Sequence, residues 1–310
     1  MTRDLVDRLD PALRHLVAAR TDLSPPVLGV VRDGLNQRRA EAAIHTDLTG
    51  VEVEQQEVAT AGGHVVAVRI YRGGPPPAPA VIYCHSGAFV LGNLDTDHLQ
   101  CVELARRARC TVLSLDYRLA PEHPFPAAID DAVAVLEWAV GRAVALGIRP
   151  DAVAVAGSSA GGALAAGLAQ RAAAGTVPAL AFTLLHQPVL DDRDTASKRE
   201  FSTTPGFDGP AAQWMWRHYL SGQEPTSTSV PGRADVSGGH PPTLITCSEL
   251  DPLRDEAIDY ARALMAAGVT TGLHTFAGTC HGFDSLLPDW DTSARLFDLQ
   301  AAALRQALLS

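Results

Sequence analysis

The stretch Gly157-Ser158-Ser159-Ala160-Gly161-Gly162 decides which fold this chain is expected to adopt. It follows the apolar, β-rich run Ala152–Ala156 and precedes an Ala- and Leu-rich stretch of helical character. A G-x-S-x-G pattern between a strand and a helix is typical of the nucleophile elbow, a sharp turn whose small residues hold a serine hydroxyl clear of the sheet. Ser159 is therefore a candidate nucleophile, although a phosphate-binding or packing turn shows the same pattern.

Short β-rich runs alternate with longer helical stretches on both sides of this turn, which predicts an α/β fold with parallel strands and crossover helices. The first two runs indicate an antiparallel hairpin around Ala61-Gly62-Gly63, and the later ones are apolar enough to be covered on both faces. The expected strands are 51–59, 64–71, Ala80–Cys84, Thr111–Leu115, Ala152–Ala156, Ala181–Leu185, Thr243–Cys247 and Thr271–Phe276, and the expected helices are about 96–108, 127–147, 160–174, 254–268 and 292–308.

Composition and charge narrow the class of protein. The 310 residues are 46% hydrophobic and 19% charged, which suits a globular chain with a large core. Lys+Arg of 25 against Asp+Glu of 35 gives a net charge of −10 without a long basic run, so nucleic acid is not expected as a partner. No stretch reaches the roughly 18 uncharged apolar residues that a membrane span requires.

The N-terminal residues and the cysteines indicate the compartment. Asp7, Arg8 and Asp10 lie where a secretory signal needs an apolar centre, so we expect a cytoplasmic protein. The cysteines are odd in number and form no C-x-x-C pair, which favours buried reduced thiols over disulfides or a metal site. They are Cys84, Cys101, Cys110, Cys247 and Cys280.

Two segments interrupt the alternation. Residues 1–45 place Leu5, Leu9 and Leu13 at helical spacing, continued by Leu16 and Val17, which predicts an amphipathic helix lying on an apolar surface. Residues 190–240 are too long for an ordinary connection. Their aromatic residues either line a pocket or lid, or only attach the segment to the main domain. These residues are Phe201, Phe207, Trp214, Trp216 and Tyr219.

A serine hydroxyl needs a base within hydrogen-bond distance and a carboxylate that orients the base. His281 and Asp251 each lie in a loop after a predicted strand, as Ser159 does. Open α/β sheets place their sites beyond the carboxyl ends of parallel strands, so the three residues are expected to meet there. Glu249 is the second candidate for the acid, whereas Asp255 and Glu256 suit the first turn of a helix.

A fourth component, His85-Ser86-Gly87-Ala88-Phe89, follows the strand that ends at Cys84. Attack on a carbonyl builds negative charge on its oxygen, which backbone N–H groups can stabilise. The expected donors are Gly87, Ala88 and Ala160. The alternative is a plain tight turn between strand and helix.

Together these motifs resemble those of hormone-sensitive-lipase-type esterases of the α/β-hydrolase superfamily. The likeness covers roughly residues 64–285, and the chain order Ser159, Asp251, His281 is the one expected for that fold. The matching stretches are His85-Ser86-Gly87-Ala88 for H-G-G-G/A, residues 116–128 for D-Y-R-L-A-P-E-x-x-F-P-A-A, residues 157–162 for G-D-S-A-G-G, residues 251–256 for D-P-L-x-D-E, and His281-Gly282-Phe283.

The resemblance implies an α/β-hydrolase fold with a mostly parallel eight-stranded sheet, helices on both faces and a helical cap. It divides the chain into an N-terminal cap segment at 1–45, a catalytic domain at 46–189 and 241–310, and a cap insertion at 190–240. It also implies the oxyanion donors named above, no cofactor and no metal, and small acyl esters as substrates. Pocket-lining roles are expected for Phe89, Phe207 and Trp214.

Two residues depart from the family pattern. Ser86 stands where the family has glycine, so the loop is strained if this position requires a positive φ. Ser158 replaces an acidic residue beside the nucleophile.

The sequence therefore predicts a serine carboxylesterase that forms an acyl-enzyme on Ser159, with His281 as base and then acid, and Asp251 orienting it. A ligand-binding protein on the same fold, or the same triad acting on an amide, lactone or biosynthetic intermediate, stays open. The choice between a monomer and a homodimer stays open too.

Overall fold

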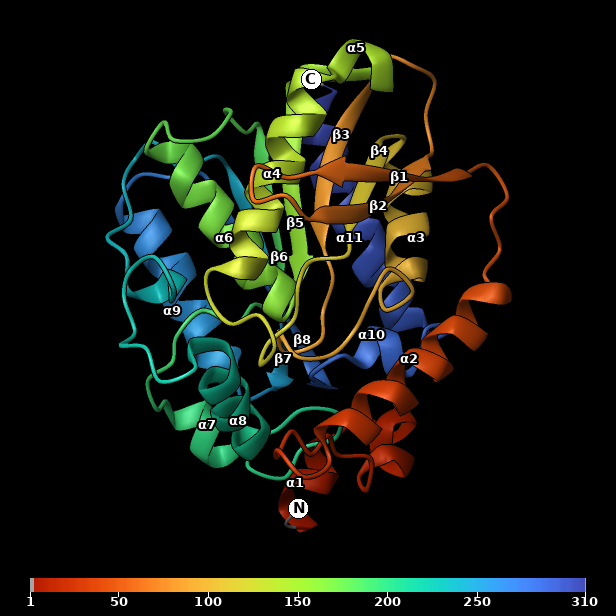
Figure 1. Ribbon diagram of the computed structural model, residues 1–310. Helices are drawn as coiled ribbons and strands as arrows, with labels where there is room; N and C mark the ends of the chain where they lie inside the picture. The colour runs from red at the N-terminus through yellow and green to blue at the C-terminus, as the bar shows by residue number, and fades with distance from the viewer. Residues whose placement is uncertain (1–2, 310) are drawn as a thin grey trace.

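Eight strands form one sheet in the computed structural model, which describes residues 3–309 (Figure 1). The strand order is β1-β2-β4-β3-β5-β6-β7-β8; β2 runs antiparallel to β1 and β4, and all other neighbours are parallel. This confirms the predicted α/β fold and its mostly parallel sheet. The strands are β1 (Glu52–Ala59), β2 (Val65–Arg72), β3 (Ala78–Cys84), β4 (Thr111–Leu115), β5 (Ile148–Ser158), β6 (Phe182–His186), β7 (Thr243–Leu250) and β8 (Thr271–Cys280).

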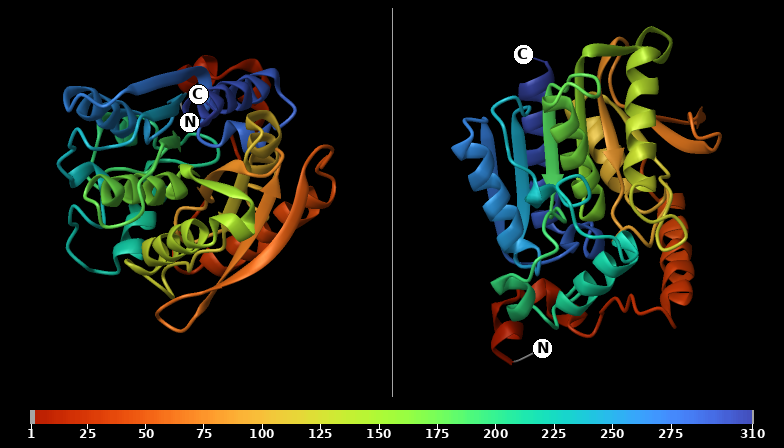
Figure 2. Two further views of the ribbon diagram at one scale, coloured as in Figure 1. Left: turned by 90° about the horizontal axis from the view of Figure 1, so that it is seen from above. Right: turned by 60° about the vertical axis from the view of Figure 1, so that its left-hand side comes forward.

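Helices cover both faces of the sheet because its central strands are apolar on both sides (Figure 2). In β3, Ile82 and Cys84 face one hydrophobic cluster, and Val81 and Tyr83 face the other. One layer contains α4 (Ala127–Gly141), α6 (Ala160–Ala173) and α9 (Arg254–Ala266), and the other contains α3 (His98–Ala108) and α11 (Asp291–Leu308). Among residues 3–309, no helix is both long and apolar enough to cross a membrane.

The observed boundaries differ from the expected ones mainly around the central strand. The single helix expected at 127–147 is divided into α4 and the short α5 (Ala143–Leu146), because Arg142 between them leaves the helical conformation (φ −111°, ψ 18°). Strand β5 is longer than predicted and continues to Ser158, next to the candidate nucleophile.

The N-terminal amphipathic segment is broken into two short helices, α1 (Arg3–Arg8) and the 3₁₀-helix η1 (Pro11–Leu16). Pro11 has no N–H to continue α1, and the Asp10 carboxylate caps η1 by accepting from the Ala12 N–H at 2.9 Å. The predicted apolar spacing is still used, because Leu5, Leu9 and Leu13 are buried in one cluster with Phe201 and Phe283. A further helix that the spacing did not predict, α2 (Leu28–Ile44), follows.

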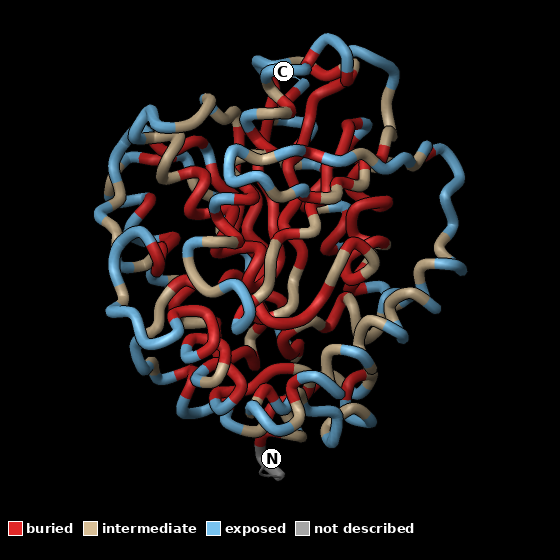
Figure 3. Tube along the Cα trace, in the orientation of Figure 1, coloured by how far each residue is buried: buried red, intermediate tan, exposed pale blue. Residues whose placement is uncertain are grey.

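The long 190–240 segment contains its own helices, α7 (Ala196–Glu200), α8 (Gly209–Leu220) and the 3₁₀-turn η2 (Pro231–Arg233). Two views show α1, α2, α7 and α8 gathered at the end of the molecule where the parallel strands terminate (Figures 1 and 2). The most exposed residues lie on the outer loops, the helix faces and the edge strand β1, whereas the central strands are buried in the interior (Figure 3).

A buried ion pair fastens this segment to the main domain. Lys198 Nζ on α7 lies 2.7 Å from Glu256 Oε2 on α9, and both side chains are almost fully buried. The Leu190 N–H donates to Glu256 Oε1 at 2.8 Å, so the start of the segment binds the same carboxyl group. Burial raises the pKa of Glu256 to about 7, although Lys198 favours its charged form.

This pair predicts a pH-dependent loss of stability in Lys198→Met. The variant leaves the Glu256 carboxylate buried without its cation, so its pKa rises further and the charged form becomes costly. We expect the free energy of unfolding to fall by about 3 kcal/mol relative to the wild type above pH 8, and by clearly less below pH 6, where Glu256 is protonated in both proteins.

Urea unfolding at both pH values measures the effect. Adding Glu256→Gln to Lys198→Met removes the charge and should remove the pH dependence. A loss of the same size at both pH values contradicts the role given to the pair.

Candidate active site

Ser159 occupies a strained turn between β5 and α6, with φ 56° and ψ −117°. The surrounding backbone binds it tightly: the Ser159 N–H donates to the His186 carbonyl at 2.9 Å, and its own carbonyl accepts from the Val189 N–H at 3.0 Å. A Cβ on Gly157 would overlap the Gly161 carbonyl, so a larger side chain would open the turn. The hydroxyl is thereby held beyond the carboxyl end of the sheet.

The structure brings Ser159, His281 and Asp251 into one hydrogen-bonded series. His281 Nε2 lies 3.0 Å from Ser159 Oγ, and His281 Nδ1 lies 2.8 Å from Asp251 Oδ2. The Asp251 carboxylate is fully buried, and its other oxygen accepts from the Leu253 N–H at 2.8 Å. Its two oxygens thus have fixed partners, which orients the imidazole ring toward the hydroxyl.

The competing acids are engaged elsewhere. Glu249 accepts from the Gly278 N–H at 2.8 Å and from Arg8 at 3.4 Å, and it is half exposed. Asp255 accepts from the Ser197 N–H at 2.8 Å, and Glu256 is paired with Lys198. Among the carboxylates that the structure describes, only Asp251 contacts His281 within hydrogen-bond distance.

The loop after β3 presents unpaired N–H groups near this series. Its backbone is left-handed at Gly87 (φ 131°), Ala88 (φ 55°) and Phe89 (φ 61°), whereas φ at Ser86 is not positive. The positive φ considered for Ser86 is therefore found at the next three residues instead. Within residues 3–309, the N–H groups of Gly87, Ala88 and Ala160 donate to no other group. They are free to bind a negatively charged oxygen.

Ser86 has a use that glycine lacks. Its hydroxyl donates to Asp97 Oδ1 at 2.8 Å, and its N–H donates to Asp97 Oδ2, also at 2.8 Å. Tyr83 OH donates to the same carboxylate at 3.0 Å. Asp97 therefore anchors the start of the loop, and sequence reasoning missed it. The Ser86 hydroxyl, which was considered only as a source of strain, is the signal that could have indicated a polar partner.

The long motif at 116–128 supports the same loop from the other side. The Tyr117 ring stacks on His85 at 4.2 Å, and Tyr117 OH donates to the His85 carbonyl at 2.8 Å. Arg118 binds the buried Asp131 through its guanidinium at 2.8 Å. This motif thus holds the backbone of the loop and contributes no group to the triad.

A cleft of about 510 Å³ opens above Ser159. Of the predicted lining residues, Phe207 lies in its wall, with its ring 5.0 Å from the His281 ring. Phe89 and Trp214 lie outside the lining: Phe89 is fully buried and stacks on Tyr219 at 3.8 Å, and Trp214 carries Arg217 over its ring at 4.8 Å. The Phe89–Tyr219 stack attaches α8 to the main domain.

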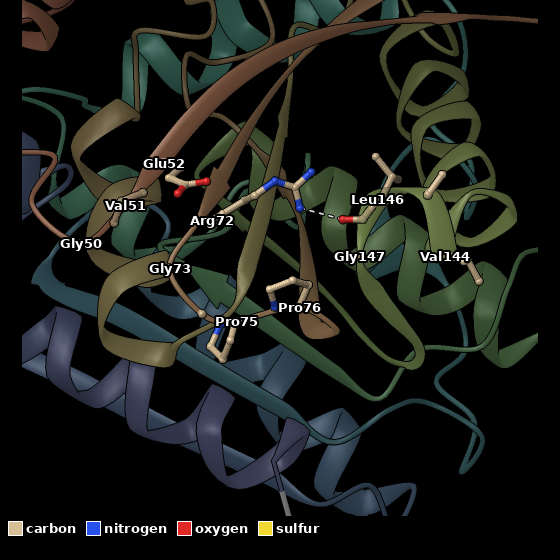
Figure 4. Close-up of a pocket in the computed structure, with 12 residues that line it drawn as sticks. Gly50, Val51, Glu52, Arg72, Gly73, Pro75, Pro76, Val144, Leu146 and Gly147 are labelled. Atoms are coloured by element: carbon tan, nitrogen blue, oxygen red, sulfur yellow. Dashed lines mark hydrogen bonds between the residues drawn. The ribbon is translucent and has the colours of Figure 1, made fainter.

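A second cavity, of about 770 Å³, lies near α5, at the end of the molecule opposite to α1, α7 and α8 (Figures 1 and 4). Its lining includes Gly73, Pro75 and Pro76, and Arg72 there donates to the Leu146 carbonyl at 2.6 Å. None of the three residues in the hydrogen-bonded series reaches it, so the smaller cleft is the candidate site.

Comparison with known proteins identifies a family and several relatives of this chain. A family described as alpha/beta hydrolase fold matches residues 81–285. The chain is 36% identical to carboxylesterase NlhH from Mycobacterium tuberculosis, over 99% of both chains. It is 34% identical to an ethyl acetate hydrolase from Pseudomonas putida, over 74% of this chain and 75% of the relative.

Solved structures agree with these relatives. The crystal structure of esterase LipW from Mycobacterium marinum superposes with a TM-score of 0.95 at 59% identity, covering 97% of this chain and 96% of that one. A bacterial heroin esterase superposes with a TM-score of 0.92 at 34% identity, covering 98% of this chain and 99% of that one.

The hydrogen-bonded series predicts the reactivity of Ser159. A fluorophosphonate should label Ser159 stoichiometrically, because the base and the N–H groups favour attack and bind the charged oxygen. Asp251→Asn should slow labelling by roughly 10³- to 10⁴-fold, since it disturbs the imidazole tautomer. Mass spectrometry of time points gives the rates.

Glu249→Gln is the matched control, because it removes one carboxylate charge two residues before Asp251, at the end of β7. Its labelling rate should stay within about threefold of the wild type, as expected for a half-exposed charge. A greater loss in Glu249→Gln than in Asp251→Asn would assign the acid to position 249.

Proposed function

Because the chain belongs to the alpha/beta hydrolase fold family, we propose that it hydrolyses carboxylic esters as a serine carboxylesterase. The observation that carries the proposal is the series from Ser159 Oγ to His281 Nε2, 3.0 Å, and from His281 Nδ1 to the buried Asp251, 2.8 Å. The esterase names of relatives that align along the whole chain support it.

In the first half-reaction, Ser159 Oγ attacks the ester carbonyl carbon while His281 Nε2 takes the hydroxyl proton. Asp251 stabilises the imidazolium that forms. The carbonyl oxygen becomes an oxyanion and is bound by the N–H groups of Gly87, Ala88 and Ala160. The C–O bond to the alcohol then breaks, and His281 returns the proton to the departing alcohol.

In the second half-reaction, water attacks the acyl group on Ser159. His281 takes a proton from this water and the same N–H groups bind the second oxyanion. When the bond to Ser159 Oγ breaks, His281 protonates the serine and the carboxylic acid leaves. The enzyme returns to its starting state with no cofactor consumed.

The proposed cap and substrate class follow from the cleft. Residues 1–45 and 190–240 form the cap, a role supported by Thr21, Leu35 and Phe207 in the cleft wall. Small acyl esters suit a cleft of about 510 Å³. A cytoplasmic location is supported by the five cysteines, all buried and free.

Ser159→Ala tests the assignment directly. The variant should lose hydrolysis of 4-nitrophenyl butyrate by about 10⁶-fold, because the nucleophile of both half-reactions is gone. In the wild type, a 4-nitrophenyl ester series should give a rate maximum at short acyl chains, of about two to six carbons. Unchanged thermal unfolding of the variant controls for the fold, and full activity in Ser159→Ala would refute the proposal.

Gly87→Ala tests the oxyanion loop. A Cβ at this position, where φ is 131°, would overlap the Leu91 carbonyl, so the loop must shift and its N–H groups move with it. We expect kcat to fall by about 10²-fold or more. Thermal unfolding is measured in parallel, because a Cβ at this φ also costs stability. Gly268→Ala is the control, because Gly268 also has a positive φ (80°), has open space around its Cβ and lies outside the cleft lining. A Gly87→Ala enzyme with wild-type kcat would remove this loop from the mechanism.

A further inference from the structure

The cleft above Ser159 is lined by cations and by no carboxylate. Arg20, Arg38 and Arg39 contribute to its wall, and no Asp or Glu does among residues 3–309. The chain as a whole has a net charge of −10. The cleft that contains the candidate nucleophile therefore has a positively charged wall, although the protein as a whole is acidic.

Two of these three arginines have no partner among the residues that the structure describes. Arg20 is paired with the Asp208 carboxylate, and Arg32 on α2 binds Glu122 at 2.9 Å. Arg38 and Arg39, on the same helix, form no salt bridge and no side-chain hydrogen bond with any residue that the structure describes. The charge of these two guanidinium groups is therefore not neutralised within the protein, although each is held in the cleft wall.

The burial of the lining residues indicates how a substrate would lie in the cleft. Ser159 is 3% exposed and lies at the bottom of the cleft, whereas Arg38 is exposed and Arg39 is half-buried. Leu35, one helical turn before them, lines the same wall. An ester whose carbonyl lies at Ser159 has an apolar wall next to it and two guanidinium groups nearer the opening.

We propose that this cleft selects esters that carry an anionic group, such as a carboxylate, at the end that faces α2. The inference rests on the proposed esterase function and specifies its substrate class. A guanidinium binds a carboxylate through two parallel N–H donors, and it keeps its charge at every physiological pH. Positive charge at the opening also raises the rate at which anionic substrates reach the cleft.

Paired chromogenic esters test the preference. For an anion on the acyl group, 4-nitrophenyl hydrogen adipate is compared with its neutral analogue, 4-nitrophenyl methyl adipate. For an anion on the alcohol, 4-acetoxybenzoate is compared with methyl 4-acetoxybenzoate. After subtraction of uncatalysed hydrolysis, kcat/KM should favour the anionic member of at least one pair, and that pair identifies the side of the ester that faces α2.

Variants assign the preference to the two arginines. In Arg38→Gln/Arg39→Gln, the ratio of kcat/KM for the anionic ester to that for its neutral analogue should fall by about three- to tenfold, as expected for two solvent-accessible ion pairs. Arg38→Lys/Arg39→Lys keeps the charge and should retain most of the ratio. Arg262→Gln, which removes a highly exposed arginine paired with Asp259 on α9, should leave it unchanged.

Ionic strength gives a readout that needs no substitution. Raising the salt from about 0.05 M to 0.5 M should reduce the anionic preference of the wild type and leave that of the double glutamine variant nearly constant. A wild-type enzyme that favours the neutral esters in both pairs, or a preference that the double glutamine variant retains, overturns the proposal. In either case, hydrolysis of the neutral esters that is lost in Ser159→Ala would leave the esterase function standing.

Discussion

The conformation of Ser159 is the constraint on which the rest of the site depends. A residue with φ 56° and ψ −117° keeps its place only where the structure around it leaves no alternative. Here β5 ends directly before it and α6 begins directly after it. Because Gly157 and Gly161 have no side chains, the strand and the helix can approach each other closely. A Cβ on Gly161 would overlap the Cys84 carbonyl, so the same absence of a side chain lets α6 pack against the end of β3. The candidate nucleophile and the start of the proposed oxyanion loop are positioned by one close backbone contact.

Residues outside this turn hold the other parts of the candidate site in place. Asp251 and His281 follow the adjacent parallel strands β7 and β8, whose carboxyl ends lie at the same edge of the sheet as that of β5. Asp97 and Tyr117 hold the oxyanion loop from two directions, through Ser86 and His85. Each proposed catalytic group is therefore oriented by hydrogen bonds from neighbouring residues, which gives the candidate site a fixed geometry before an ester arrives.

The sequence predicted the sheet, its strand positions and the family because these depend on local signals. Continuous apolar runs mark β3 and β5, and the small residues around Ser159 mark a turn that few sequences permit. It failed where contacts join distant segments: Phe89 packs on Tyr219 rather than lining the cleft, and the carboxylate partner of Ser86 is Asp97. Helix α2 was missed because only Leu28 on it is fully buried, so its sequence has no clear apolar stripe. Without α2, the placement of Arg38 and Arg39 in the cleft wall was beyond prediction as well.

In the proposed mechanism, Ser159 carries the acyl group between the two half-reactions. Rapid quenching during turnover of 4-nitrophenyl butyrate, followed by mass spectrometry of the intact protein and of its peptides, measures this directly. We expect a transient gain of one butyryl group, located on the peptide that contains Ser159 and lost as the ester is exhausted. Acylation of a different residue, or turnover of this activated ester during which the protein gains the acyl mass at no quench time, would contradict it.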